Sequence, residues 1–182
     1  EQWIQQVRGL MAELPRVMAE RFVRDYGLSE YDATQLTQSL AMASYFENAV
    51  KMAGKKSDER QLAKLVANWM LGELSAQLNA RELTISQSPL GPEQLAAHVQ
   101  FVFLQKVANP KALFKAILED QAGPFSTFQE VVARFEQLIR EKDLAPMNDT
   151  GALEVIVDEV IAANAKNVAE FKAGNEKALN AL

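Results

Sequence analysis

Residues 42–54, MASYFENAVKMAG, carry the clearest helical pattern of the chain. Their apolar side chains recur every three or four residues, which places them on one face of an α-helix. Gly54 is suited to end that helix, because glycine tolerates the backbone conformation that follows a last helical turn. We therefore predict an amphipathic helix with one buried face. That face consists of Met42, Tyr45, Phe46, Ala49, Val50 and Ala53.

The helical spacing continues on the N-terminal side of this stretch. A helix is predicted to begin at Pro15, since a proline in the first turn loses no hydrogen bond, and to end at Gly27. The residues that follow, Ser29-Glu30-Tyr31-Asp32, form a capping pattern in which the serine hydroxyl accepts a hydrogen bond from a backbone N–H group.

Helices are also predicted on the C-terminal side. The pattern indicates a long helix from Ser57 to Leu78. Residues 82–92 are expected to form a loop, because two prolines and a glycine interrupt the spacing there. Two more helices are expected over residues 92–107 and 111–120. Strand patterns are nearly absent, so the predicted fold class is all-α.

The segment Gln121–Pro124 is the predicted boundary between two small helical bundles, since its glycine and proline interrupt the pattern. The first bundle would comprise residues 1–122 and the second residues 123–182. Before the boundary 13 basic residues face 14 acidic ones, and after it 6 face 10. The second bundle is therefore the more acidic of the two.

Capping patterns place the helices of the second bundle. Ser126, with Gln129 three residues later, is expected to cap its first helix. Asn148 or Asp149 is expected to cap the next helix, and a last pair of short helices would surround Gly174. The inward face of the first helix is predicted to contain Phe128, Val131, Val132, Phe135, Leu138 and Ile139.

Composition excludes several classes of protein. The chain has 182 residues, a net charge of −5 and a hydrophobic fraction of 48%. It contains no cysteine, which excludes disulfides, thiolate nucleophiles and iron–sulfur clusters, and one histidine, which excludes a multi-histidine metal site. No apolar run approaches the ~18 residues of a membrane span. A cytoplasmic protein without membrane association is expected, and the chain is interpreted as a piece of a longer one.

Candidate catalytic or metal-binding groups are few. His98 lies between two apolar residues of a predicted helix, where a packed histidine is expected rather than a ligand. Acidic residues such as Asp58 and Glu59 fall on polar helix faces, where solvated side chains are the rule. The glycines occur singly, so no phosphate-binding loop is predicted. We predict no catalytic residue and no metal site.

Basic residues gather within residues 51–64, where the chain turns a corner at Gly54. Such a cluster can meet the phosphates of a nucleic acid, because affinity depends on local charge more than on total charge. The acidic Asp58 and Glu59 between them favour an ordinary solvated corner instead. The basic residues are Lys51, Lys55, Lys56, Arg60 and Lys64.

Short strings of residues are more specific than any periodicity. They are ELP at 13–15, RF at 21–22, YGLSEYDA at 26–33, YFE at 45–47, ANW at 67–69, DTGAL at 149–153 and FKAGNEKAL at 171–179. Together they resemble the helical region and the YqeY-like tail of the GatB family, which is the B subunit of the aspartyl/glutamyl-tRNA amidotransferases. Members of that family usually have a Gly-x-Ile-Ser-x-Lys-type segment where this chain has residues 104–114, and they continue past Leu182.

The resemblance implies a division of labour. A GatB protein uses ATP to activate Glu or Asp mischarged on tRNA(Gln) or tRNA(Asn). Ammonia released in the A subunit then completes the amidation, while the C subunit holds the assembly together. ATP and Mg²⁺ would bind a catalytic cradle that precedes Glu1, so no cofactor is expected within this chain. The helical and tail regions would hold the tRNA, and DNA is not an expected partner.

The candidate tRNA-binding residues are basic side chains in both bundles. They are Lys51, Lys55, Lys56, Arg60, Arg140, Lys142, Lys172 and Lys177. The residues that carry the resemblance near the N-terminus, among them Arg21 and Tyr26, are interpreted as structural. Two alternatives remain open: an adaptor that docks the other proteins of the amidotransferase without touching RNA, and a free-standing YqeY-like enzyme.

Overall fold

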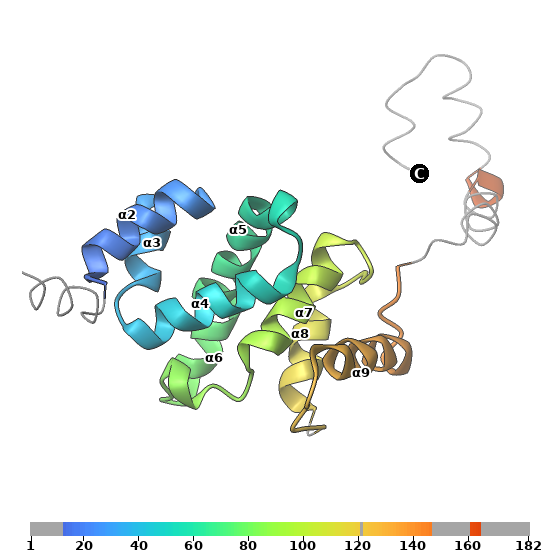
Figure 1. Ribbon diagram of the computed structural model, residues 1–182. Helices are drawn as coiled ribbons and strands as arrows, with labels where there is room; N and C mark the ends of the chain where they lie inside the picture. Colours follow the sequence, from blue (N-terminus) through green and yellow to red (C-terminus); the bar gives the residue numbers. More distant parts are fainter. Residues whose placement is uncertain (1–12, 121, 147–160, 165–182) are drawn as a thin grey trace, which may run out of the picture. The chain divides into compact units, whose positions relative to one another are not determined.

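The computed structural model describes residues 13–120, 122–146 and 161–164 (Figure 1). The chain divides into two compact units, Glu1–Ala145 and Pro146–Leu182. Every regular element in the described residues is helical, which confirms the all-α prediction. Within these ranges no helix combines the length and the hydropathy that a membrane span requires. The α-helices are α2 (Pro15–Tyr26), α3 (Glu30–Leu36), α4 (Leu40–Ala53), α5 (Glu59–Trp69), α6 (Ser75–Ala80), α7 (Pro92–Phe103), α8 (Pro110–Glu119) and α9 (Phe128–Glu141).

Helix α4 lies at the centre of the first unit, where it packs most extensively against α7 and also contacts α5 (Figure 1). Its predicted apolar face is buried, with Met42 half-buried at the edge. The Phe46 ring lies 4.9 Å from the ring of Phe22 in α2. The Tyr45 hydroxyl donates a hydrogen bond of 2.8 Å to the carbonyl oxygen of Leu90. Burial of a large apolar side chain stabilises a fold by roughly 1.5–3 kcal/mol, so this face contributes much of the unit's stability.

One predicted cap is confirmed and the other lies one residue further along. The Ser29 hydroxyl accepts a hydrogen bond of 3.0 Å from the Asp32 N–H group, as the pattern predicted. At the second pattern the N-cap is Thr127, not Ser126, since the Thr127 hydroxyl accepts from the Glu130 N–H group. The Glu130 carboxylate in turn accepts from the Ser126 N–H group at 2.9 Å. Glu130, not Gln129, thus makes the bond that reaches back to the start of α9, and this bond goes to the residue before the N-cap.

The long helix predicted from Ser57 to Leu78 is interrupted. It begins with the 3₁₀ turn Lys56–Asp58, continues as α5, passes through the π-helical turn Met70–Leu74 and ends as α6. The Ser75 hydroxyl donates to the Met70 carbonyl oxygen at 2.7 Å within this turn. A π turn contains one residue more than an α turn, and apolar periodicity alone does not reveal it.

The helix predicted over residues 92–107 ends earlier, at Phe103. Gln105 adopts a left-handed conformation with φ of 52°, and the Lys106 N–H group donates to the Phe101 carbonyl oxygen at 2.9 Å. These contacts form a Schellman motif, which satisfies the last helical carbonyl groups. The sequence carries no glycine at this position, so the pattern did not reveal the stop.

The first compact unit extends past the boundary predicted after residue 122. Helix α9 packs against α7 and α8 within that unit. Its buried face consists of Val131, Phe135, Leu138 and Ile139. Hydrogen bonds also join the residues after the predicted boundary to those before it. The Ala108 N–H group donates to the Leu144 carbonyl oxygen, and Arg134 binds Asp120 through two hydrogen bonds of 2.9 Å. The predicted helix after Asn148 or Asp149 lies mostly outside the described residues, and the helices around Gly174 lie wholly outside them.

Candidate nucleic-acid interface

The corner between α4 and α5 contains the first group of predicted binding residues. Lys51 lies in the last turn of α4 and Lys55 in the turn that follows, and both side chains are exposed. Lys56 begins the 3₁₀ turn before α5. In the part of the chain that the structure describes, the ammonium groups of Lys51 and Lys55 have no ion-pair partner. Their charges are therefore available to an anionic ligand.

Arg60 has a structural partner that the sequence did not indicate. Its guanidinium group donates to the carbonyl oxygens of Arg24 at 3.0 Å and Asp25 at 3.3 Å, at the end of α2. Cations are favoured at the C-terminal end of a helix, where carbonyl groups lack partners and the helix dipole is negative. Arg60 thus joins α5 to α2, and this role accounts for its position without a phosphate.

Lys64 and Asn68 follow Arg60 at intervals of four residues on the exposed side of α5. They border a surface groove of about 420 Å³ between α5 and the turn that joins α2 to α3. The predicted tRNA-binding residues include neither of them. The sequence shows the four-residue spacing of Lys64 and Asn68 from Arg60. It does not show that a turn more than thirty residues earlier lies opposite them. The lining residues are Gly27, Leu28, Ser29, Asp32, Lys64, Ala67 and Asn68.

The second group of predicted binding residues is only partly described. Arg140 lies in the last turn of α9 and Lys142 is its C-cap residue, and both side chains are exposed. Asp143 follows in a left-handed turn with φ of 51°, as expected for a loop residue. The structure thus brings Arg140 and Lys142 to one helix end. Lys172 and Lys177 lie outside the described residues.

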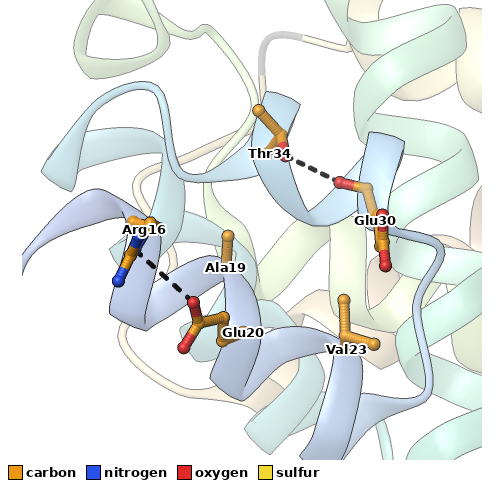
Figure 2. Close-up of a pocket in the computed structure, with 6 residues that line it drawn as sticks. All are labelled: Arg16, Ala19, Glu20, Val23, Glu30 and Thr34. Carbon is orange, nitrogen blue, oxygen red and sulfur yellow. Dashed lines mark hydrogen bonds and ion pairs between the residues drawn. The ribbon is translucent and has the colours of Figure 1, made fainter.

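A pocket of about 410 Å³ between α2 and α3 lacks the features of a catalytic site (Figure 2). Arg16 and Glu20 form an ion pair on its rim, with 89% and 67% of their side chains exposed. The Thr34 hydroxyl donates to the Glu30 carbonyl oxygen across one turn of α3. Acid–base catalysis requires titratable groups that converge on a sheltered space, which these exposed side chains do not form.

The carboxyl groups with lowered pKa values near α2 and α9 are held by arginines. The Arg21 guanidinium lowers the pKa of Glu13, and the Arg134 guanidinium lowers that of Asp120. Arg21 also binds Glu47 at 2.6 Å, so it bridges two carboxylates, in agreement with the structural role inferred for it. None of these residues lines the pockets described above. The described residues also contain no group of three metal-ligating side chains.

His98 is packed in the core, as predicted. Its ring lies 4.3 Å from the ring of Trp69 and 5.4 Å from that of Phe114, each in an edge-to-face arrangement. The residue is fully buried, and neither ring nitrogen has a hydrogen-bond partner among the described residues. Burial lowers the pKa of His98 to about 3, because the apolar surroundings disfavour the charged form. The ring is therefore neutral at physiological pH.

Comparison with known proteins identifies the family. Residues 44–182 match the model of the GatB domain. The chain belongs to this family. The match includes the α4–α5 corner, α9 and the whole of the second unit, and it confirms the resemblance that the short strings indicated.

Relatives of this GatB-domain chain extend the match to its N-terminal residues. The chain is 47% identical over 182 residues to the B subunit of the aspartyl/glutamyl-tRNA(Asn/Gln) amidotransferase of Albidiferax ferrireducens, and 45% identical over 183 residues to that of Variovorax paradoxus. Both alignments cover 100% of this chain and 35% of the relative. The chain therefore spans about a third of the length of these relatives and corresponds to their C-terminal part.

Proposed function

We propose that this chain is the tRNA-holding part of an aspartyl/glutamyl-tRNA amidotransferase of the GatB family, and that its α4–α5 corner faces the tRNA backbone. The exposed ammonium groups of Lys51, Lys55 and Lys64 support this proposal, since none has an ion-pair partner in the described residues. By contrast, Arg21 and Arg134 are each held by two carboxylates. Unpaired cations thus lie at this corner despite the chain's net charge of −5.

Charged corners of this kind suit the recognition of folded RNA. The deep major groove of an A-form helix is inaccessible to side chains, so proteins contact phosphates, 2′-hydroxyl groups and the overall shape of the RNA. Each phosphate that a lysine neutralises releases counterions, and the affinity then falls as salt rises. A binding surface built from a few lysines is therefore expected to give strongly salt-dependent affinity.

The wider reaction is proposed from the named relatives. Their name states amidotransfer on aspartyl- or glutamyl-tRNA(Asn/Gln). From the family resemblance we propose that ATP and Mg²⁺ bind a part of the amidotransferase outside this chain. The protein partners in this scheme are the A and C subunits of the amidotransferase. The chain itself positions tRNA and takes no part in the chemistry. The pocket of Figure 2, with its exposed charged side chains, and the arginine-held carboxylates fit a binding role.

The proposal is tested by titrating the chain with tRNA(Gln) and tRNA(Asn) transcripts at about 50 and 200 mM salt. We expect Lys55→Glu to weaken binding at least fivefold and to lower the slope of log affinity against log salt by about 1. Arg81→Glu is the matched control, because Arg81 is also exposed and has no ion-pair partner in the described residues, but lies at the far end of α6. Equal losses for the two variants, or no binding by the unmodified chain, would overturn the proposal.

A second function, docking of another protein, is favoured by apolar side chains on the first two helices. Leu14 is 62% exposed and Val17 46% exposed, on or next to α2, and Tyr31 in α3 is 71% exposed. Helices α2 and α3 pack against each other, and exposed apolar side chains on neighbouring helices are a feature of interaction surfaces. Co-elution of the chain with the A or the C subunit, lost in a Val17→Asp variant that still binds tRNA, would support this function beside the first.

A further inference from the structure

The groove between α5 and the α2–α3 turn is built from two walls of different chemistry. One wall carries Lys64 and Asn68, which are both exposed and lie one turn apart, about 6 Å along the axis of α5. Neither side chain has a hydrogen-bond or ion-pair partner in the described part of the chain. The other wall carries the Asp32 carboxylate. Lys64, Asn68 and Asp32 thus line one space of about 420 Å³.

Hydrogen bonds hold both walls in place. The two bonds from the Arg60 guanidinium to the carbonyl oxygens of Arg24 and Asp25 fix the start of α5 against the end of α2. The Ser29 hydroxyl donates to Oδ2 of Asp32 at 2.7 Å, which orients this carboxylate and leaves Oδ1 without a partner in the described residues. A site preorganised in this way loses little side-chain entropy on binding.

The two walls together select among ligands. The Lys64 ammonium group attracts a phosphate, whereas the Asp32 carboxylate repels one and needs a hydrogen-bond donor. A ribose unit of RNA supplies both groups, since its phosphate is an acceptor and its 2′-hydroxyl is a donor. DNA supplies the phosphate without the hydroxyl. An acidic protein segment supplies carboxylates, which Asp32 repels, and has no 2′-hydroxyl beside a phosphate.

We propose that this groove holds one ribose-phosphate unit of the RNA backbone and distinguishes RNA from DNA, an inference that rests on the tRNA-binding function proposed above. Lys64 pairs with the phosphate, and Asp32 accepts a hydrogen bond from the 2′-hydroxyl. Asn68, one turn further along α5, hydrogen-bonds the same unit through its amide. Arg60 acts as a positioning residue that sets the distance between the walls.

The test compares binding of a tRNA(Gln) transcript and of DNA with the same sequence. Lys64→Gln is expected to weaken tRNA binding about fivefold at low salt, as the loss of one exposed ion pair predicts, and to lower the salt slope by about 1. Asp32→Asn is expected to strengthen the binding of DNA. It removes the repulsion, so DNA binds more tightly and the preference for RNA falls several-fold. Arg81→Gln is the control for the loss of one positive charge elsewhere.

The outcomes separate this inference from the function on which it rests. Failure of the unmodified chain to bind tRNA overturns both. If Lys55→Glu weakens binding while Lys64→Gln and Asp32→Asn leave it unchanged, the groove is overturned and the tRNA-binding function stands. A loss for Asp32→Asn that is equal for RNA and DNA also overturns the groove, because a structural defect would have that effect. Thermal unfolding of the same variants identifies such a defect directly.

Discussion

His98 provides a direct measurement of how the core is built. It is the single histidine of the chain, and its buried ring has no hydrogen-bond partner among the described residues. Its pKa is about 3 in the folded protein, against an ordinary value of 6.5. Because the folded-state pKa is the lower one, the unfolded chain takes up the proton first as pH falls. The stability contributed by the neutral ring is complete above about pH 6.5 and is lost progressively towards pH 3.

The size of this loss follows from the two pKa values. Proton linkage gives a decrease in the free energy of unfolding of about 2 kcal/mol between pH 7 and pH 5, and about 3 kcal/mol by pH 4. Stabilities of whole domains are of order 5–15 kcal/mol, so the effect is large enough to measure. Burial is the cause of the lowered pKa, since the ring is surrounded by Trp69, Phe114 and other core residues.

The experiment compares the unmodified chain with His98→Leu in urea denaturation at pH 7, 6 and 5. The variant removes two buried nitrogens without hydrogen bonds, a gain of about 1–3 kcal/mol, and loses two edge-to-face ring contacts of about 0.5–1.5 kcal/mol each. These terms offset each other at pH 7, where the two proteins are expected to differ by less than about 1 kcal/mol.

The difference between the two proteins isolates the histidine, because all carboxyl groups are common to both. We expect the variant to become more stable than the unmodified chain by about 2 kcal/mol as pH falls from 7 to 5. A constant difference across this range would refute the reasoning. It would mean that the ring is hydrated or hydrogen-bonded in solution and that the packing around Trp69 is open.

Three further substitutions have effects on the free energy of unfolding that thermal and urea unfolding can measure. Gly27→Ala is expected to destabilise the chain by about 1 kcal/mol, because Gly27 has φ of 66°, although a Cβ there would meet only ordinary contact distances. Gly72→Ala is the control, because Gly72 is exposed and helical and its added Cβ would meet nothing within 4 Å. This substitution should stabilise the chain by about 0.5–1 kcal/mol. Destabilisation would mean that the π turn requires a glycine at this position. Arg134→Met is expected to lower the free energy of unfolding by about 1–2 kcal/mol at pH 7, since the Arg134–Asp120 pair is only partly exposed. The loss should become smaller as pH falls through the lowered pKa of Asp120. A loss independent of pH would indicate that Arg134 acts through packing alone.

Short-range patterns predicted much of this fold. The buried face of α4 and the Ser29 cap depend on residues within a few positions of one another, and both follow from spacing and hydrogen-bonding chemistry. The second cap illustrates the limit of such patterns, because Ser126 and Thr127 are adjacent candidates. The contacts decide between them, since the Thr127 hydroxyl accepts from the Glu130 N–H group while the Glu130 carboxylate accepts from the Ser126 N–H group.

Contacts between distant segments were not predictable in the same way. The apolar face of α9 was visible in the sequence, but nothing local indicates that it packs on α7 and α8 within the first unit. The same holds for the candidate interface. Arg60 binds carbonyl groups that lie 35 and 36 residues earlier, and Lys64 faces a turn of similar separation. A single sequence identifies the charged residues and not the backbone groups that lie opposite them.

The π turn at Met70–Leu74 makes the chain sensitive to length as well as to composition. Because an α-helix advances about 100° per residue, deletion of one residue from α5 would rotate everything after it by more than a quarter of a revolution, whereas deletion from the π turn would remove its extra residue and leave an α turn. Leu78, now buried on α6, would point away from the core after the deletion in α5 and would keep its place after the deletion in the π turn. Single-residue deletions, which loops usually absorb without harm, would shift the register between α5 and α6 unless they fall in the π turn.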